Sequence, residues 1–415
     1  MKRLVYIWLL LIFTISLFGQ SESIRVATYN LLRFPYNNGT GRMASFRAVV
    51  QAMNPDVLVV QELQSEQGCI MFLDSVMNAE QPLYAAAPYV DGRDTDNMLY
   101  YKTDRLKLIQ SESIQTYLRN IGKYTLTHTE GSDTFRIYVV HLKAGTEADD
   151  RERRQWDAAL LRGKLNSLAS GSYFLVAGDF NVYNGTEPAF VVLTESQDDN
   201  DGQCFDPVDH VGKWHDNAAF AYWHTQSTRT TLIDSGATGG LDDRFDFILC
   251  SKPFLEPGGL SVIQDSYAAF GNDGLHFNSS IQAGGNRMVR DEVAEALYYA
   301  SDHLPVYMDF TVEMKDTLSS VSFYDQFPRH LHLYQNYPNP FNGQTRIAYE
   351  QFQRGDVRLS VYDIHGKRLI CLLFPGQEAG YHTCLLNMDN FASGVYLYRV
   401  QVNDNVVGKK LILLK

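Results

Sequence analysis

The chain has 415 residues, of which 45% are hydrophobic and 20% charged, the composition of a well-cored globular protein with room for two or three domains. Its five cysteines fit a disulfide framework poorly, and without a C-x-x-C pair a zinc or thioredoxin-type site has no support. The formal net charge of −12 is unevenly spread. Without the nine Lys/Arg and six Asp/Glu of residues 331–415, and without Lys2 and Arg3, residues 21–330 carry 25 positive against 42 negative side chains. A region this acidic does not attract nucleic acid through its overall field.

The first twenty residues have the three-part pattern of an export signal. Lys2 and Arg3 precede an apolar run from Leu4 to Phe18, and the small and polar residues 19–21 follow it. An uncleaved membrane anchor is the alternative, but the run is short for a bilayer core. No Cys stands at the expected cleavage point, which argues against a lipoprotein. The sequence therefore predicts a signal peptide at 1–20 and a secreted or cell-surface protein.

Residues 21–314 read as alternating strands and helices, and we predict that they form one domain. Predicted strands lie at 23–31, 56–63, 97–102, 134–143, 173–180, 245–251 and 305–312. Three helices are predicted. The first contains Phe46, Val49, Val50 and Met53 at helical spacing, and the other two span 147–168 and 289–299. The helix at 147–168 places Trp156 and Leu160 on its apolar face. Arg151, Glu152, Arg153 and Arg154 are expected on its solvated face. This mixture predicts a two-layered sheet core flanked by helices.

Residues 315–332 lack periodicity and are predicted to be a linker. Residues 333–415 contain short alternating strands at 345–349, 357–362, 382–386, 395–402 and 409–414, separated by turn residues. Such even spacing predicts a small Ig-like β-sandwich. Cys371 and Cys384 lie close enough in sequence for a local bridge, which the sequence leaves open, whereas Cys250 in an apolar run reads as a buried free thiol.

Six polar segments of the first domain stand at the ends or beginnings of predicted strands. They are Thr28-Tyr-Asn30, Gln61-Glu-Leu63, His141-Leu-Lys-Ala144, Gly178-Asp-Phe-Asn181, Asp243-Arg-Phe-Asp-Phe-Ile-Leu249 and Ser301-Asp-His-Leu-Pro305. Each has an ordinary structural explanation when taken singly, such as an Asx-turn or a hydrogen-bonded core histidine. Together they place acids and amides at one sheet edge, where a carboxylate is costly unless it is paired or binds a metal. Hard oxygen donors without cysteine favour Mg²⁺, Mn²⁺ or Ca²⁺.

This ordered set resembles the endonuclease/exonuclease/phosphatase (DNase I-like) superfamily over residues 24–312. Its most specific pieces are Gly178-Asp-Phe-Asn181 and Ser301-Asp-His-Leu-Pro305, and both are intact. The resemblance implies a four-layer α/β (α+β) sandwich with the active site at one end of two packed sheets. It also implies a divalent cation, with Mg²⁺ first, bound principally by Glu62, with Asn30 beside it and Asp302 near a second metal position.

The same resemblance assigns the catalytic roles. His303 resembles the general base or phosphate-contacting histidine, oriented by Asp246. Asp179 would position the nucleophilic water or assist the leaving group, and Asn181 would donate to a phosphate oxygen. His141 would stabilise the charge of the transition state. The resemblance leaves open how His303 and Asp179 divide the proton transfer.

A second cluster, containing His224 and Arg229, precedes the strand that holds Asp246. Arg229 is a candidate phosphate clamp because a guanidinium matches two phosphate oxygens, and His224 is a candidate substrate contact beside it. A loop held together by its own hydrogen bonds explains the same residues equally well.

The last segment resembles the type IX secretion sorting domain over residues 333–415. The motifs are Asn336-Tyr-Pro-Asn-Pro-Phe-Asn342, Val361-Tyr-Asp-Ile-His-Gly366, Ala379-Gly380, Ser393-Gly-Val-Tyr396 and Lys409-Lys410. The resemblance implies recognition by an outer-membrane secretion machinery, and no other stable protein partner is predicted. An adhesive or carbohydrate-binding sandwich is the alternative.

Three functions fit the whole sequence. The first is a secreted metal-dependent phosphodiesterase, most simply an extracellular endonuclease-like hydrolase. The second is a sphingomyelinase or phospholipase C-like hydrolase, which would need an exposed apolar membrane-docking loop that does not stand out in the sequence. The third is a non-catalytic surface-binding protein on the same fold, against which the complete set of motifs argues.

Overall fold

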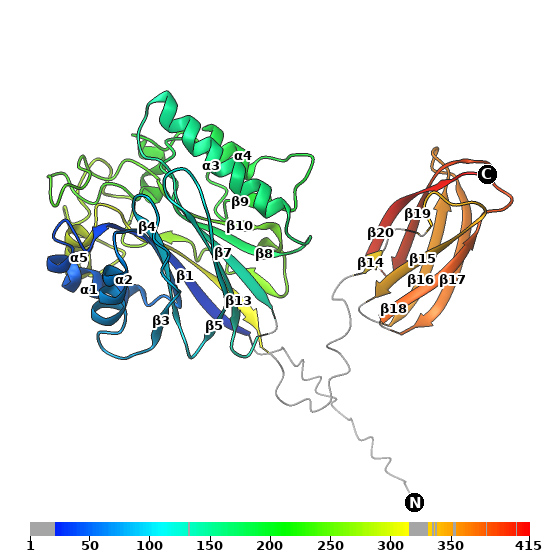
Figure 1. The fold of residues 1–415 in the computed structure, drawn as a ribbon, viewed down its shortest axis with the longest axis horizontal. Coiled ribbons are helices and arrows are strands. Elements are labelled where there is room, and N and C mark those ends of the chain that lie inside the picture. The colour runs from blue at the N-terminus through cyan, green and yellow to red at the C-terminus, as the bar shows by residue number, and fades with distance from the viewer. Residues whose placement is uncertain are drawn as a thin grey trace, which may run out of the picture. The chain divides into compact units, whose positions relative to one another are not determined.

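A computed structural model describes residues 21–131, 133–314, 331–333, 336, 338–351, 354–378, 380–403 and 405–415 (Figure 1). The predicted signal peptide and nearly all of the predicted linker lie outside these residues. The chain divides into two compact units, Met1–Asp316 and Thr317–Lys415, called here the catalytic unit and the sorting unit. No helix among the described residues is both long and apolar enough to cross a membrane.

The first sheet of the catalytic unit has seven strands in the order β11-β13-β1-β2-β4-β3, with β12 also pairing with β13. Its strands are β1 (Ser21–Phe34), β2 (Val57–Leu63), β3 (Tyr84–Ala86), β4 (Asp96–Lys102), β11 (Leu260–Val262), β12 (Ala268–Ala269) and β13 (Val306–Glu313). β1 and β2 are parallel neighbours, so their carboxyl ends lie at the same edge of the sheet.

The second sheet has six strands in the order β5-β6-β7-β8-β10-β9. Its strands are β5 (Leu106–Ile114), β6 (Ile121–His128), β7 (Thr134–His141), β8 (Tyr173–Asp179), β9 (Cys204–Phe205) and β10 (Asp246–Ser251). β7 and β8 are parallel, whereas β10 runs antiparallel to β8. The carboxyl ends of β7 and β8 therefore meet the beginning of β10.

The two sheets pack face to face, and helices cover their outer faces, as Figure 1 shows. The helices are α1 (Met43–Met53), α2 (Glu66–Phe72), α3 (Ala148–Asn166), α4 (Pro188–Thr194) and α5 (Asp291–Ala300), with short turns η1 (Gly39–Arg42), η2 (Leu73–Met77), η3 (Ala218–Trp223) and η4 (Lys252–Leu255). β7 illustrates the layering. Its Ile137 packs in the core that also contains α1 and α5, while Tyr138 packs with α3 and α4. The predicted four-layer α/β sandwich is confirmed.

Every predicted strand and helix of the catalytic unit is present, with ends shifted by a few residues. β5 and β6 were not predicted, because the solvent face of β5 breaks its apolar pattern. The predicted faces of α3 need two corrections. Trp156 and Leu160 are exposed, at 64% and 39%, and Arg154 is fully buried on a face expected to be solvated. A buried salt bridge to Glu187 is the reason for the burial of Arg154.

The sorting unit is a small sandwich of two antiparallel sheets around one apolar core. The three-stranded sheet holds β14 (His332–Leu333), β15 (Gln344–Gln351) and β18 (Gly380–Asn387), and the four-stranded sheet holds β16 (Gly355–Tyr362), β17 (Arg368–Gln377), β19 (Gly394–Val402) and β20 (Asn405–Leu413). Cys371 on β17 and Cys384 on β18 belong to different sheets and are both free thiols. Cys250 is a buried free thiol, as predicted.

Candidate active site

The second sheet places three of the predicted site residues in one row. His141 ends β7 and is the register partner of Asp179, which ends β8. Asp179 is in turn the register partner of Asp246, which begins β10. All three side chains are buried. Residues far apart in sequence therefore stand side by side because a parallel and an antiparallel pairing meet at the same edge.

The first sheet contributes Asn30 near the end of β1 and Glu62 in β2. The β1–β2 register is irregular beyond Asn30, and the β2–β4 register is irregular between Val60 and Leu63. Glu62 adopts a φ of 64°, a left-handed conformation that is uncommon for a non-glycine residue and that re-aims its side chain. Its carboxylate is 18% exposed, the most open of the site carboxylates that form ion pairs.

Asn30 joins the two sheets at the site. Its amide nitrogen lies 3.1 Å from Glu62 Oε1 and 3.1 Å from Asp179 Oδ2, so one side chain donates to carboxylates from both sheets. The backbone N–H of Leu32 donates to Asn30 Oδ1 at 3.0 Å, and the N–H of Arg33 donates to Glu62 Oε2 at 3.0 Å. These bonds fix the two oxygen-bearing side chains before any ligand binds.

His303 reaches the same group from the loop before β13. Its Nδ1 is 2.7 Å from Asp246 Oδ2, and both side chains are buried. Its Nε2 lies 3.9 Å from Asp179 Oδ2 and 2.6 Å from the side-chain amide nitrogen of Gln226. The carboxylate on Nδ1 orients the ring, so that Nε2 is the atom that faces the other site residues.

His141 and Asn181 complete the group of predicted residues that the structure brings together. His141 Nε2 is 3.5 Å from Asp179 Oδ2 and 3.8 Å from Glu62 Oε1. Asn181 has a φ of 50°, and its amide nitrogen donates to the carbonyl of Leu142 at 3.1 Å. Its backbone N–H also donates to Asp179 Oδ1 at 3.0 Å. Left-handed backbone at both Asn181 and Glu62 is the kind of local strain that clusters at functional sites.

The two histidines have opposite electrostatic environments. Burial lowers the pKa of His141 well below its ordinary value, and the charges of Arg119 and His303 lower it further. Burial also opposes a charge on His303, but Asp246 and two further carboxylates outweigh it and raise the pKa of His303 well above its ordinary value. The surroundings therefore favour the neutral form of His141 and the protonated form of His303.

Asp179 lies between them. Burial raises the pKa of Asp179 to about 7, and the neighbouring carboxylates of Asp246 and Glu62 add to the rise, while His303 opposes it. A carboxyl group whose pKa lies near neutrality can both accept and release a proton at physiological pH.

Asp302 sits apart from the Asn30–Glu62 pair in its contacts. The backbone N–H of Ala237 donates to Asp302 Oδ2 at 2.6 Å, and Ser301 Oγ lies 3.5 Å from Oδ1. Ser301 Oγ also donates to the carbonyl of Asn30 at 2.7 Å, so the loop that carries Asp302 is tied to β1. Among the described residues, no side-chain contact joins Asp302 to Glu62.

The two candidate substrate contacts are both fully buried. His224 Nε2 is hydrogen-bonded to the carbonyl of Trp214 at 2.8 Å, which gives it a structural explanation. The Arg229 guanidinium donates from Nη1 to the carbonyl of Ile233 at 3.3 Å, and among the described residues its Nε and Nη2 have no hydrogen-bond partner. Burial lowers the pKa of Arg229, and the carboxylate of Asp302 opposes that shift. Arg229 therefore lies within the electrostatic influence of Asp302, and a substrate contact by Arg229 or His224 stays a prediction.

Two residues of the site were not predicted. Gln226 contacts His303, and Arg119, whose Nη1 donates to the carbonyl of Leu142 at 3.1 Å, lowers the pKa of His141. Arg119 precedes β6, a strand whose pattern was not recognised. Gln226 lies in a loop with no periodic signal, so no local feature of the sequence marks it.

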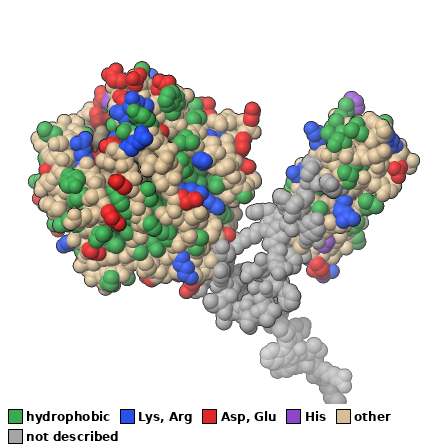
Figure 2. Space-filling view, viewed as in Figure 1, with side chains coloured by type: hydrophobic (Ala, Val, Ile, Leu, Met, Phe, Trp, Pro, Cys, Tyr) green, Lys and Arg blue, Asp and Glu red, His purple; other side chains and the backbone are tan. Residues whose placement is uncertain are grey.

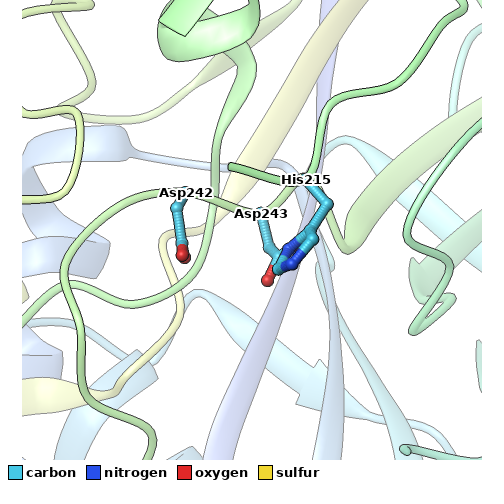
Figure 3. Close-up of side chains that lie close together, drawn as sticks. All are labelled: His215, Asp242 and Asp243. Atoms are coloured by element: carbon cyan, nitrogen blue, oxygen red, sulfur yellow. The ribbon is translucent and has the colours of Figure 1, made fainter. Parts of the chain in front are cut away.

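A further group stands beside Gln226. His215 Nδ1 is 2.8 Å from Asp243 Oδ1, and Figure 3 shows Asp242 next to this pair. The ligand atoms of the three side chains lie within 4.8 Å of one another, the one group of three His, Cys, Asp or Glu residues in the described part of the chain that is close enough to share a cation. The carboxylates of Asp242 and Asp243 have raised pKa values, mainly through burial, and that of Asp243 is raised to about 6.

The donors of the predicted metal site fit a divalent cation. Glu62 and Asn30 offer hard oxygens, the ligand type that Mg²⁺, Mn²⁺ and Ca²⁺ prefer, and Asp179 adds a carboxylate beside them. Asp302, predicted near a second metal position, offers its carboxylate in the loop before β13. Within the described ranges, no Lys or Arg forms an ion pair with Glu62 or Asp179, and the imidazoles of His141 and His303 are the basic groups that lie near them. A bound cation would relieve the repulsion that raises the pKa of Asp179.

Comparisons with known proteins identify two families in the chain. Residues 27–303 match the model of the Endonuclease/Exonuclease/phosphatase family, and residues 335–414 match the Secretion system C-terminal sorting domain. No curated protein sequence matches the chain.

Among solved structures, the chain is similar to D. rerio TDP2 complexed with single strand DNA product, with 15% identity, a TM-score of 0.47 and coverage of 69% of this chain and 98% of that one. It is also similar to the human Nocturnin catalytic domain with bound sulfate anion, with 19% identity, a TM-score of 0.45 and coverage of 70% and 97%. An endonuclease/exonuclease/phosphatase family protein from Bacteroides thetaiotaomicron matches with 16% identity, a TM-score of 0.45 and coverage of 73% and 99%. The family model spans more than half of the chain, which therefore belongs to the Endonuclease/Exonuclease/phosphatase family of phosphoric ester hydrolases and carries a secretion-system sorting domain.

Proposed function

We propose that the catalytic unit is a metal-dependent phosphodiesterase that acts outside the cell, most simply as an endonuclease-like hydrolase. The observation that carries this proposal is the meeting of Asn30 with Glu62 and Asp179 across the two sheets, beside the His303–Asp246 pair. Phosphodiester hydrolysis needs charge neutralisation, a base for water and donors to the phosphate, and this group supplies all three.

Glu62 and Asn30 would hold the cation, with Asp302 at a second position. Mg²⁺ is the first choice, and Mn²⁺ or Ca²⁺ would suit the same oxygens. When bound, the cation neutralises charge on the phosphate oxygens. Glu62 is the more exposed carboxylate, so it can accept a ligand at the mouth of the site while Asn30 stays fully buried.

The proton transfers follow from the electrostatics. Asp179, with a pKa of about 7, would accept the proton of the attacking water. His303, protonated and held by Asp246, would donate from Nε2 to a phosphate oxygen. His141 would donate to the same developing charge as a neutral imidazole, and Asn181 would add an amide donor after releasing the carbonyl of Leu142. This division assigns the base to Asp179 and the phosphate contact to His303.

Whether the substrate is a nucleic acid depends on the charge of the catalytic unit. On the face drawn in Figure 2, acidic and basic side chains are interspersed over the catalytic unit, without a broad basic patch. An acidic unit without such a patch would bind nucleic acid through a few local contacts at the site, so its affinity would fall only weakly with salt.

A phospholipase C-like activity is the second candidate, and exposed apolar side chains favour it. Leu232 is 72% exposed and lies five residues before Ala237, whose N–H donates to Asp302. Leu275 and Tyr222 are also exposed. Gly274, the neighbour of Leu275 in sequence, lies against Tyr222, so Leu275 and Tyr222 belong to the same part of the surface. Such side chains could enter a lipid surface.

The route to the outside of the cell forms part of the same proposal. The sorting domain matched at residues 335–414 supports export through a type IX machinery. The signal at residues 1–20 would bring the chain across the inner membrane first. The enzyme would then act at the cell surface or in the medium.

The test is a matrix of metals and substrates with the full chain. After chelation, Mg²⁺, Mn²⁺ or Ca²⁺ is added back against DNA, RNA, sphingomyelin and a bis-aryl phosphodiester. Metal-restored hydrolysis is expected for at least one substrate, and the substrate identifies the candidate. His303→Ala should abolish it, whereas His128→Ala, a buried histidine of β6 outside the site, should not. Activity that survives in a folded His303→Ala protein, or that is absent with every pair, would contradict the proposal.

A further inference from the structure

Gln226 makes the closest contact to the reactive nitrogen of His303. Its side-chain amide nitrogen lies 2.6 Å from His303 Nε2, across 77 positions of sequence. A neutral Nε2 accepts from this nitrogen, whereas a protonated Nε2 donates to the oxygen of the amide after the amide turns over. His303 Nδ1 is already bonded to Asp246. Both ring nitrogens therefore have a protein partner, and the partner of Nε2 stands on the side from which a phosphate would approach. The inference drawn from this contact rests on the function proposed above.

The backbone of Gln226 is held on both sides, so its side chain has a fixed starting point. Gln226 forms isolated β-bridges with Asp243 and with His303. Its N–H donates to the carbonyl of Asp243 at 3.1 Å, and its carbonyl accepts from the N–H groups of Asp242 and Asp243 at 2.9 and 3.0 Å. On the other side, the N–H of Leu304 donates to the carbonyl of Thr225 at 2.7 Å. The segment thus ties the loop of His303 to the loop before β10.

The gap between His303 and Asp179 needs an explanation. Nε2 and Asp179 Oδ2 are 3.9 Å apart, beyond hydrogen-bonding distance, although both groups are buried and can bond directly to each other. A direct bond between them would occupy the proposed base and the proposed phosphate donor at once. Each atom has another partner instead, because Asp179 Oδ2 accepts from Asn30 and Nε2 contacts Gln226.

A glutamine is well suited to hold the ring of His303. Its amide carries both a donor and an acceptor, so it can bond to Nε2 whether that nitrogen bears a proton or not. It is uncharged, so it does not compete with Asp246 for the ring. Its length lets a side chain that starts beside Asp243 reach Nε2, which a shorter asparagine from the same backbone would not do.

We propose that Gln226 is a positioning residue that holds His303 Nε2 apart from Asp179 Oδ2 and so keeps open the gap that a phosphate oxygen enters. When substrate arrives, the phosphate oxygen replaces the amide on Nε2, and the flexible Gln226 side chain turns aside while its backbone stays in place. The residue acts through His303, not on the substrate itself.

The experiment replaces the amide and measures both the gap and the rate. Gln226→Met keeps the length of the side chain and removes its hydrogen bond, and Gln226→Asn keeps the amide but shortens it. Gln203→Met is the matched control, because Gln203 is similarly half-buried and bonds only the carbonyl of Thr194. Crystal structures of the full-length variants give the distance from His303 Nε2 to Asp179 Oδ2. Steady-state hydrolysis of a bis-aryl phosphodiester gives kcat and KM.

In both Gln226 variants we expect the 3.9 Å gap to close to a hydrogen bond. We expect kcat to fall on the order of 10- to 100-fold, the effect of a misplaced catalytic group, with KM changed by less than about twofold. Gln203→Met should alter neither quantity. A gap that stays open in both variants, or a rise in KM at unchanged kcat, would overturn the positioning role. If the wild-type chain hydrolyses nothing, the proposed function fails, but the crystallographic distance still decides the role of Gln226.

Discussion

The two units of the chain stabilise their interiors in different ways. The catalytic unit buries complete ion pairs, including Arg154–Glu187 and Arg244–Asp206, as well as the His303–Asp246 pair of the site. The sorting unit has an apolar core, and an ion pair between two of its described residues, Arg354 and Glu378, is exposed at 70% and 75%. Both units are sheet sandwiches, so this polarity is not a requirement of their architecture.

Burying a pair of charges costs desolvation energy that packed apolar side chains would avoid. The position of the buried pairs shows what they contribute. Arg154 donates to the carbonyls of Lys143 and Gly145, just after His141, and Arg244 lies two residues before Asp246. In the catalytic unit the buried charges therefore hold the loops that carry the site. The sorting unit, which is expected to be recognised from outside, needs no such supports.

The largest expected effect comes from the site itself. Glu62→Gln keeps the size of the side chain and its bond to the N–H of Arg33, but removes the charge that would hold a cation. We expect activity to fall about 10²- to 10³-fold, with partial recovery at high metal concentration. Metal titrations of the rate measure this. Glu66→Gln, an exposed acid at the start of α2, is the control, and equal losses in both variants would contradict the role of Glu62.

The next effect tests a buried support. Glu187→Ala leaves Arg154 buried without its counter-charge, so the catalytic unit should lose about 3 kcal/mol or more of stability. Thermal unfolding of the full chain should show a shift in the transition of the catalytic unit only. The double variant Arg154→Met with Glu187→Leu removes both charges and should be less destabilised than Glu187→Ala. If the double variant is the less stable of the two, the pair itself is the source of stability.

A smaller effect depends on pH. Burial raises the pKa of Asp157 on α3 to about 6, above its ordinary value, although Arg119 opposes the shift. The folded state therefore holds this proton more tightly than the unfolded chain, and wild-type stability gains as pH falls from 7 to 4. Asp157→Asn should stabilise the unit at pH 8 by up to about 1 kcal/mol after allowance for solvent screening, and the gain should vanish near pH 4. Unfolding at both pH values measures it, and a less stable variant at pH 8 contradicts it.

The smallest effect lies in the sorting unit. Arg354→Ala removes one partner of an exposed pair whose N–O separation is 3.4 Å, and solvent screens such pairs strongly. The stability of the sorting unit should change by less than about 0.5 kcal/mol. A loss comparable with that of Glu187→Ala would mean that the two units do not differ in the way described here.

Much of the fold and the core of the site could be predicted from the sequence. The polar residues at the strand ends predicted that Asn30, His141 and Asp179 would lie close together, because the carboxyl ends of parallel strands lie at one edge of a sheet. The faces of α3 could not be predicted, since helical spacing treats Trp156 as a core residue and Arg154 as a solvent residue. The partner that reverses this reading, Glu187, stands 33 positions away.

What the sequence by itself determined is the order of elements and the chemistry of the strand ends, because these depend on local periodicity and on residue type. What only the tertiary structure decided is which side chains complete the site. Gln226 has no local signal, yet its side chain contacts His303, and the burial of Arg229, a candidate phosphate clamp, could not be read from its sequence neighbours. Contacts between loops distant in sequence depend on how two sheets pack, and no pattern within either loop records that packing.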